Sequence, residues 1–396
     1  MTLTREENEL LTRVGPGTPA GELFRRYWLP FAVAAELTGE QPTKFIRLLG
    51  EDLVLFRDRS ENVGLLADHC AHRGASLLYG RVEERGIACA YHGWLYDVHG
   101  NCLETPAEPA DSLFRLTVRQ RAYPVRRFLG LYWAYLGPDP VPAIPRLDLW
   151  VRQDGTRKLY VQPILDCNWL QPMENSVDPA HSRILHADAV ARHGSARGPV
   201  LNTTRGFTDH VEYFDFSELP YGIMKKRVSR NGHVDEHPVV FPNILRHGND
   251  TQIRVPIDDT HTWIVFVNFE PSEDGAPIAP RDDLPVEYLG PYKEPADGRH
   301  PFTRYTMEDV QYQDHMAWET QGPIADRSVE RLATSDRGIA MFRQMLKREI
   351  EKVQQGIEPI GVYRDPDHPV IDTNHTAQMQ EWSRIARGRN RQGASV

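Results

Sequence analysis

The chain has 396 residues, of which 40% are hydrophobic, and a formal net charge of -9. This length predicts two or three domains, each able to bury a hydrophobic core. The acidic balance argues against a nucleic-acid-binding protein, which needs a basic face to meet phosphates. No apolar run reaches the roughly 18 residues of a membrane-spanning helix, and the N-terminus lacks the pattern of a secretory signal. We therefore expect a cytoplasmic protein that neither binds nucleic acid nor crosses a membrane.

Apolar residues at helical spacing predict helices over residues 6–14 and 20–38, within an N-terminal helical segment of residues 1–41. From residue 42 the pattern changes to short apolar or alternating runs separated by glycine and asparagine, which are typical of strands joined by tight turns. We expect a small antiparallel β domain over residues 42–140. It should end at a proline cluster that reads as a linker.

The second half of the chain, residues 141–396, is mixed. Two helices are predicted over residues 306–320 and 335–355, and a long loop over residues 270–304. Strands of one antiparallel sheet are predicted over residues 207–216, 222–228, 238–246 and 262–269. The fold class is therefore α+β, with an all-β N-terminal domain and a C-terminal domain that combines an antiparallel sheet with helices.

Two pairs of metal-ligating residues stand in the predicted β domain. Cys70 and His72 form the first pair, and Cys89 and His92 follow after sixteen residues. Glycine beside each pair lets the backbone turn closely around a metal cluster. The four side chains fit either a tetrahedral structural zinc or a Rieske [2Fe–2S] cluster, in which two thiolates bind one iron and two imidazoles the other. Because each turn supplies one cysteine and one histidine, the spacing favours the Rieske cluster. The two remaining cysteines, Cys102 and Cys167, are expected to be buried apolar residues.

A second candidate metal site lies in the stretch ENSVDPAHSRILH, which holds Asp178, His181 and His186. Two histidines five residues apart point about 140° away from each other in a regular helix. They can bind one metal only if the helix is distorted or ends between them. Pro179 disfavours helical geometry at Asp178, so a break is expected there.

With a Rieske motif first and a histidine pair later, nearly the whole chain resembles the oxygenase component of Rieske non-haem iron oxygenases. It is most similar to the phthalate dioxygenase type, through NWLQPMENSVDPAHSRILH, PYGIMKKR, FPNILRHG and QDHMAWETQGPIADRSVERLATSDRGI. The resemblance implies a catalytic domain of the helix-grip (START/Bet v1-like) kind. It also implies a mononuclear Fe(II) bound by His181, His186 and a carboxylate from residues 306–320. Asp314 fits that carboxylate best, with Asp309 as the alternative.

The resemblance also implies how electrons reach the iron. Asp178 would hydrogen-bond a Rieske histidine and an iron histidine across a subunit boundary, and Asn175 would lie near the iron without binding it. A head-to-tail homotrimer, or a stacked hexamer, would place the two sites side by side. The chain shows no dinucleotide-binding pattern of a strand, G-x-G-x-x-G and a helix. We therefore expect a separate NAD(P)H-dependent reductase, of the flavin and ferredoxin type.

The substrate implied is an aromatic compound, and an aromatic carboxylate such as a phthalate fits the resemblance. An acidic protein needs local cationic or polar groups to bind a carboxylate, and Arg205, Arg246 and Asn243 are the candidates. The reaction would be dihydroxylation, monohydroxylation or O-demethylation with dioxygen. Two other hypotheses remain: a Rieske electron carrier with a non-catalytic binding domain, and a zinc-stabilised binding protein.

Overall fold

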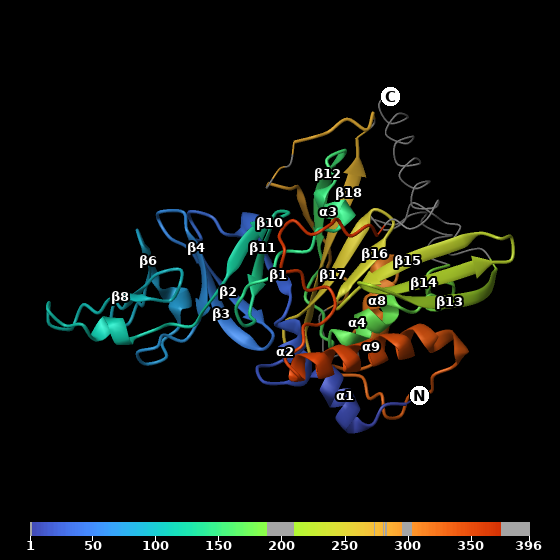
Figure 1. Ribbon diagram of the computed structural model, residues 1–396, viewed down its shortest axis with the longest axis horizontal. Helices are drawn as coiled ribbons and strands as arrows, with labels where there is room; N and C mark the ends of the chain where they lie inside the picture. Colours follow the sequence, from blue (N-terminus) through green and yellow to red (C-terminus); the bar gives the residue numbers. More distant parts are fainter. Residues whose placement is uncertain are drawn as a thin grey trace.

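The computed structural model describes residues 2–187, 210–272, 274–279, 281, 283–294 and 303–373, and all structural statements concern these residues. An elongated part built of short strands forms one end of the molecule, and a large sheet flanked by helices forms the other (Figure 1). No helix among these residues is long and apolar enough to cross a membrane.

The N-terminal segment contains two short helices and a strand. Helix α1 (Arg5–Thr12) begins at a capping box, and helix α2 (Pro19–Phe24) follows. The predicted helix over residues 20–38 is wrong beyond Phe24, because the chain continues as strand β1 (Trp28–Val33), which pairs antiparallel with β11 (Leu131–Tyr135). Every residue of β1 is buried. A strand buried on both faces has no polar alternation, so its apolar run cannot be told from a helix by pattern alone.

Helix α1 packs against the C-terminal half of the chain. The side-chain amide of Asn8 donates to the carbonyl oxygen of Ala325 at 3.0 Å. Glu7 pairs with Lys347 at 2.5 Å, on the long helix α9 (Arg337–Gln354). The start of the chain is thus fixed to the C-terminal half, called the back half below, although the β domain lies between them in the sequence.

The front half of the molecule, which contains β1 to β11, is built of short antiparallel strands, as predicted. Their bounds are β2 (Thr43–Leu48), β3 (Glu51–Arg57), β4 (Val63–Ala67), β5 (Arg81–Glu83), β6 (Gly86–Ala88), β7 (Leu95–Tyr96), β8 (Cys102–Glu104), β9 (Ala122–Tyr123) and β10 (Val125–Phe128). They form three sheets in the orders β1-β11-β10, β2-β3-β4-β9 and β5-β6-β7-β8. Single 3-10 turns lie at η1 (Ala34–Glu36), η2 (Leu77–Tyr79) and η3 (Phe114–Thr117).

One eight-stranded sheet dominates the back half, in the order β13-β14-β15-β16-β17-β18-β12-β19. The bounds are β12 (Gly155–Val161), β13 (Val211–Leu219), β14 (Gly222–Ser229), β15 (Val234–Val240), β16 (Ile244–His247), β17 (Asp250–Pro256), β18 (Thr262–Pro271) and β19 (Val286–Tyr288). All neighbours are antiparallel except β12 and β19. The predicted sheet is confirmed, but the predicted strand 238–246 is divided between β15 and β16, β17 was not expected, and β19 lies within the predicted loop.

The helices of the back half lie beside this sheet. Their bounds are α3 (Asp148–Val151), α4 (Leu170–Ser176), α5 (His181–Leu185), α8 (Val310–Glu319) and α9, with a 3-10 turn at η4 (Thr334–Asp336). Helices α8 and α9 confirm the two predicted over residues 306–320 and 335–355. Helix α4 lies between α8 and α9 (Figure 1). Since α4 and α5 carry the stretch ENSVDPAHSRILH, this arrangement brings it next to a helix far downstream in the sequence.

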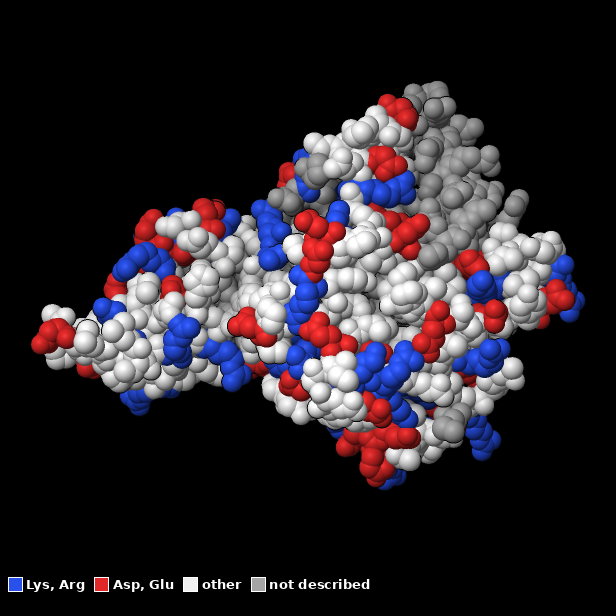
Figure 2. All heavy atoms as spheres, viewed as in Figure 1, with Lys and Arg blue, Asp and Glu red and all other residues white. Residues whose placement is uncertain are grey.

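A single hydrophobic core joins the two halves. It contains Trp133 of the front half, Leu159 and Val267 of the large sheet, and Phe342 and Leu346 of α9. On the face of the molecule seen in Figure 2, acidic and basic side chains are mixed, with no extended area of one sign. That visible face therefore offers no basic surface of the kind that meets nucleic acid.

Candidate metal centres

The two cysteine–histidine pairs lie on two loops that are closed in the same way. The N–H of Gly74 donates to the carbonyl oxygen of Cys70 at 2.8 Å, and the N–H of Gly93 donates to that of Cys89, also at 2.8 Å. Both glycines have φ near +74°, in the left-handed region where a side chain is strained. The glycines that the sequence places beside each pair are therefore needed for the turns.

The four donor groups of these loops converge. Cys70 and Cys89 are both buried, and the rings of His72 and His92 lie 4.5 Å apart between centroids. The Nδ1 atom of His72 is buried without a hydrogen-bond partner among the described residues. Burial raises the pKa of the Cys70 thiol, so the thiolate form needs a cation beside it. Two thiols and two imidazoles in this state fit a metal centre rather than an ordinary polar cluster.

Aromatic side chains cover the loops. The ring of Trp94 stacks on His72, with centroids 4.2 Å apart, and the hydroxyl of Tyr96 lies 3.2 Å from the sulfur of Cys70. Cys102 is buried in the same apolar cluster, and Cys167 is buried in a second one beneath the large sheet. The expectation that these two cysteines are buried apolar residues is confirmed.

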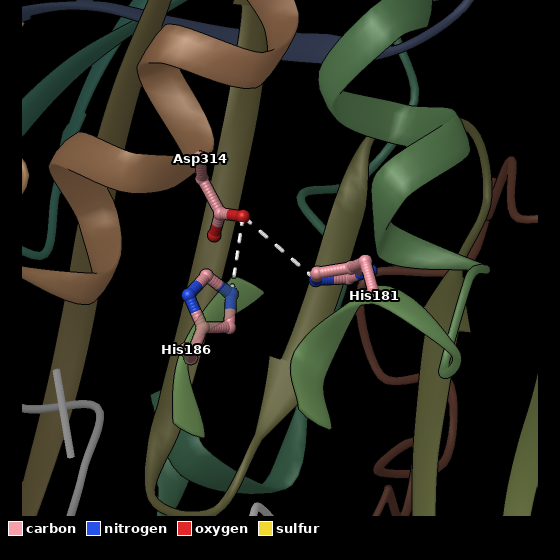
Figure 3. Close-up of side chains that lie close together, drawn as sticks. All are labelled: His181, His186 and Asp314. Atoms are coloured by element: carbon pink, nitrogen blue, oxygen red, sulfur yellow. Dashed lines mark ion pairs between the residues drawn. The ribbon is translucent and has the colours of Figure 1, made fainter. Parts of the chain in front are cut away.

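His181, His186 and Asp314 converge on one point in the back half, and their ligand atoms lie within 4.8 Å of one another. Figure 3 shows Asp314 reaching down from α8 toward the two histidine rings. Its Oδ1 atom lies 3.2 Å from the Nε2 atom of His186 and 3.8 Å from that of His181. The three groups form one face of two imidazoles and a carboxylate, which leaves the remaining positions around a metal free for other ligands.

The backbone around the histidine pair is broken as the sequence predicts. Helix α4 ends at Ser176, and α5 covers only His181–Leu185, so His186 directly follows its last turn. Asp178 lies between the helices, where its Oδ1 atom accepts a hydrogen bond from the backbone N–H of Ala180 at 2.7 Å. The end of the helix before His186 allows two histidines five residues apart to face one metal.

Each histidine is held through its other ring nitrogen. The Nδ1–H of His181 donates to Asp178 at 3.2 Å, and that of His186 donates to the side-chain oxygen of Gln313 at 2.9 Å. The Gln313 amide nitrogen donates in turn to the carbonyl oxygen of Met307 at 3.0 Å, which fixes its orientation. Both Nε2 lone pairs therefore point toward Asp314, the tautomer that a metal ligand requires.

Asn175 lies beside the same point. Its side-chain nitrogen is 3.2 Å from the Nε2 atom of His181 and 3.3 Å from the Oδ1 atom of Asp314. An amide nitrogen can only donate, so it does not compete with the histidines and the carboxylate as a ligand. Asn175 therefore lies beside the three candidate ligands without being one of them.

The charges of the three groups reinforce one another. Burial by itself raises the pKa of Asp314, but His186 and His181 outweigh it and lower the pKa to about 2. Burial lowers the pKa of His186, but Asp314, Gln313 and Asp309 together raise it above its usual value. An ionised carboxylate between two imidazoles is the donor set that suits a ferrous ion.

The other acids of the ligand-bearing helix have different partners. Asp309 caps the N-terminus of α8 by accepting from the backbone N–H of Gln311 at 2.8 Å. Glu319, at the other end, accepts from Lys293 and from the hydroxyls of Tyr292 and Tyr305. Of Asp309, Asp314 and Glu319, only Asp314 joins the two histidines.

Comparison with known proteins identifies the family of the chain. Residues 27–124 match the Rieske [2Fe-2S] domain model, and residues 301–380 match the model described as LigXa C-terminal domain like. The 5,5'-dehydrodivanillate O-demethylase oxygenase subunit of Sphingobium sp. (strain NBRC 103272 / SYK-6) is 38% identical over 374 residues, or 92% of this chain and 84% of that protein. The chain belongs to the Rieske oxygenases.

Two further Rieske oxygenases extend the comparison. The phthalate 4,5-dioxygenase oxygenase subunit of Pseudomonas putida is 35% identical, covering 91% of this chain and 89% of that protein. The terminal oxygenase of carbazole 1,9a-dioxygenase from Novosphingobium sp. KA1 shares the fold, with a TM-score of 0.60 at 20% identity over 88% of this chain and 99% of that chain. As in other Rieske oxygenases, the cofactors of this chain are a [2Fe–2S] cluster and a mononuclear iron.

The back half of this Rieske oxygenase also contains a buried charge cluster that steadies α4. Glu174 accepts from Arg327 through two hydrogen bonds of 2.8 Å and from Arg343 at 2.7 Å. Both arginines come from the matched C-terminal region. Because Asn175 directly follows Glu174, this cluster positions the helix that leads into the metal site.

Of the residues expected to bind substrate, Arg246 is not brought to the metal site. Arg246 is opposite Thr251 in the sheet, so these two side chains share one face. Arg254 is three residues beyond Thr251 on β17 and therefore lies on the opposite face, where Asp314 affects its pKa. Arg246 therefore points to the other face, where it donates to Asp148 at 3.2 Å. Asn243 is buried, and its amide donates to the carbonyl oxygen of Arg254 at 2.8 Å. Arg205 lies outside the described residues.

Proposed function

We propose that the chain is a terminal oxygenase in which His181, His186 and Asp314 hold the mononuclear iron. The observation that supports this assignment most directly is the convergence of three ligand atoms within 4.8 Å from two distant parts of the chain. The iron, when bound, supplies the site at which dioxygen is activated. The protein's part is to keep both Nε2 lone pairs and the carboxylate oriented, through Asp178 and Gln313.

Cys70, His72, Cys89 and His92 are proposed to hold the [2Fe–2S] cluster. The strands beside these loops, β6 and β8, lie at the far end of the molecule from α4 and α8 (Figure 1). Such a separation supports a head-to-tail homotrimer, alone or stacked as a hexamer, in which the cluster of one subunit meets the iron of the next. Asp178, bonded to His181 at 3.2 Å, is then the link between the two centres.

The electrons are proposed to come from a separate NAD(P)H-dependent reductase of the flavin and ferredoxin type. The relatives are named as oxygenase subunits, that is, as parts of multicomponent systems. A Rieske cluster passes one electron at a time. The reductase must therefore accept the two electrons of the nicotinamide hydride together and pass them on one by one.

The proposed substrate is an aromatic compound, and an aromatic carboxylate such as a phthalate is the first candidate. One relative is named a phthalate 4,5-dioxygenase, which supports dihydroxylation. Another is named a 5,5'-dehydrodivanillate O-demethylase, which supports removal of the methyl group of an aryl methyl ether at the same iron site. Both reactions use dioxygen and two electrons, so the protein geometry required of the metal ligands is the same.

A product screen tests the proposal. Purified protein, a competent reductase, NADH and oxygen would be supplied with phthalate isomers, substituted benzoates and aryl ethers, and products would be identified by mass. We expect one class to be oxygenated, and His181→Ala to abolish turnover while the red-brown Rieske absorption is retained. A colourless protein would support the zinc hypothesis. Turnover that survives in His181→Ala would contradict the iron site, and a reducible cluster without any turnover would support the electron carrier.

A further inference from the structure

A small polar pocket lies between α5 and the large sheet, lined on one side by near neighbours of His181 in the sequence. On that side the pocket is lined by Pro179, which precedes α5, and by Ser182 of α5, which follows His181. Its sheet side is formed by residues of β14, β15 and β16, namely Lys225, Arg227, Asp235, His237 and His247. On the sheet, Lys225 is opposite His237 and Arg227 is opposite Asp235, so the side chains of both cations lie on the face that meets α5.

Most charges of this pocket are already matched. Arg227 forms a buried ion pair with Asp235, and the Nε2 atom of His237 lies 3.2 Å from the same carboxylate. Burial lowers the pKa of His237 well below its usual value and that of His247 to about 4, so both rings are neutral near pH 7. The histidines therefore add no positive charge, and Asp235, the only carboxylate among the described residues that line the pocket, pairs with Arg227.

Lys225 is the exception. Its side chain is 7% exposed, yet among the described residues its ammonium has neither a hydrogen bond nor an ion pair. The charged groups that face it are Arg227, Asp178, Asp235 and Arg254. Asp178 is held by His181 and the backbone of Ala180. Neither carboxylate thus binds the ammonium directly.

A second donor in the same pocket is also unmatched. The Nη1 atom of Arg227 is buried without a hydrogen-bond partner among the described residues. Buried polar groups in proteins nearly always have a partner, and a buried cation is costly without one. Burial lowers the pKa of Lys225 to about 8, which leaves it largely protonated at pH 7. The pocket thus contains the Lys225 ammonium and the buried Arg227 Nη1 atom, neither of which has a partner among the described residues, so it is suited to an anionic group.

We propose that Lys225, assisted by Arg227, binds the carboxylate of the substrate and so positions the aromatic ring at the iron site. A carboxylate is ionised at pH 7 and can accept from both donors, whereas a phenol with a pKa near 10 stays neutral. The inference rests on the proposed oxygenase function and assigns the anchoring role to β14, in place of Arg246 and Asn243. Lys225 is thus a specificity-determining residue, and the uncharged part of the substrate extends from it toward His181.

The test compares acids with their neutral amides on the holoenzyme. Vanillate, phthalate and 3-hydroxybenzoate, each beside its primary carboxamide, would be titrated anaerobically into the wild type by calorimetry. We expect at least one acid to bind more tightly than its amide. Lys225→Met should weaken that acid on the order of 10- to 100-fold, the value of a charged hydrogen bond, and leave the amide within about twofold. Lys225→Arg should restore most of the preference for the acid.

Lys226→Met is the matched control. Lys226 is the next residue on β14, points to the other face and pairs with Glu236 at 2.8 Å, so its loss should leave both ligands unaffected. The wild-type preference for the acid does not depend on how any variant folds, and its absence for all three pairs would overturn the proposal. An equal loss of kcat for acid and amide in Lys225→Met would also overturn it, since Lys225 would then act on Asp178 rather than on the substrate. Acid binding without turnover of any compound would instead contradict the oxygenase function and leave the anchor standing.

Discussion

Gln313→Leu is the most direct test of how the protein prepares its iron site. The Nδ1–H of His186 donates to Gln313 at 2.9 Å inside a buried environment. Leucine keeps the volume of the side chain but removes the acceptor. A buried donor without a partner costs about 1–3 kcal/mol. His186 can avoid that cost by moving the proton to Nε2, which removes the lone pair that faces Asp314.

The expected result is a loss of ferrous-iron affinity. At about 1.4 kcal/mol for each tenfold change, the lost hydrogen bond corresponds to a factor on the order of 5 to 150, and orienting partners of metal-bound histidines are typically worth about 10- to 100-fold. Affinity would be measured anaerobically by titration of Fe(II) against a competing chelator, on protein whose Rieske cluster is loaded. The visible spectrum of the cluster reports that the rest of the chain is folded.

Two variants make this experiment specific. Gln313→Glu keeps an acceptor for His186. This variant should therefore bind iron more tightly than Gln313→Leu. Gln311→Leu breaks a buried bond of the same helix, the 3.1 Å contact with Gln162, without touching the histidines, and should bind iron normally. Equal iron affinity in the wild type and Gln313→Leu would refute the argument that this contact fixes the tautomer of His186.

Three further predictions follow from buried charges. Glu174→Gln leaves Arg327 and Arg343 without a counter-charge and should lower the free energy of unfolding by about 3–5 kcal/mol, measured by urea denaturation; a loss below about 1 kcal/mol would contradict the buried ion cluster. Asp178→Asn should leave the Rieske spectrum intact and slow turnover at least about tenfold, since His181 loses its charged acceptor; normal turnover would exclude Asp178 from the electron path. The charge of Lys225 is present below its pKa of about 8 and lost above it, so the affinity for an aromatic acid should fall as pH rises through 8 while that for the amide stays level; parallel profiles would rule out the ammonium as the anchor.

The two cysteine–histidine loops of the front half could be predicted from the sequence because their information is local. Cys70 and His72, like Cys89 and His92, lie within one tight turn each, and the glycine that closes each turn is next to them. The histidine pair was equally local, including the need for a broken helix. Asp314 was different, since nothing in the pattern of α8 separates it from Asp309, and it was chosen by resemblance.

The sheet register could not be predicted, and this explains why Arg246 was wrongly expected at the metal site. A strand sends alternate side chains to opposite faces, so a shift of one residue exchanges the two faces. The sequence favours Arg246 as a pocket residue, but in the sheet Arg246 faces away from the candidate iron site, whereas Arg254 faces it. Lys225 and Lys226 pose the same problem on β14, where one is buried and the other paired at the surface.

Strand β17 was missed for a related reason. All seven of its residues are buried, yet Asp250, Gln252 and Arg254 are polar, so the run reads as a loop. Burial of charged residues on one face of a strand is uncommon outside functional sites. The prediction for strand β1 was wrong for the opposite reason, because this strand is apolar throughout and buried on both faces. In both cases the burial that decides the structure comes from other parts of the chain.

The attachment of α1 to the back half bears on how such proteins can exchange parts. A chimaera that takes its front half from a relative, cut at the proline cluster, would also replace Asn8 and Glu7, whose partners Ala325 and Lys347 remain behind. A recombination that spares these contacts needs two crossovers, one after α1 and one before α3 (Asp148–Val151). In such a recombination α1 is kept with the back half, and the front half is exchanged as the segment between the two crossovers.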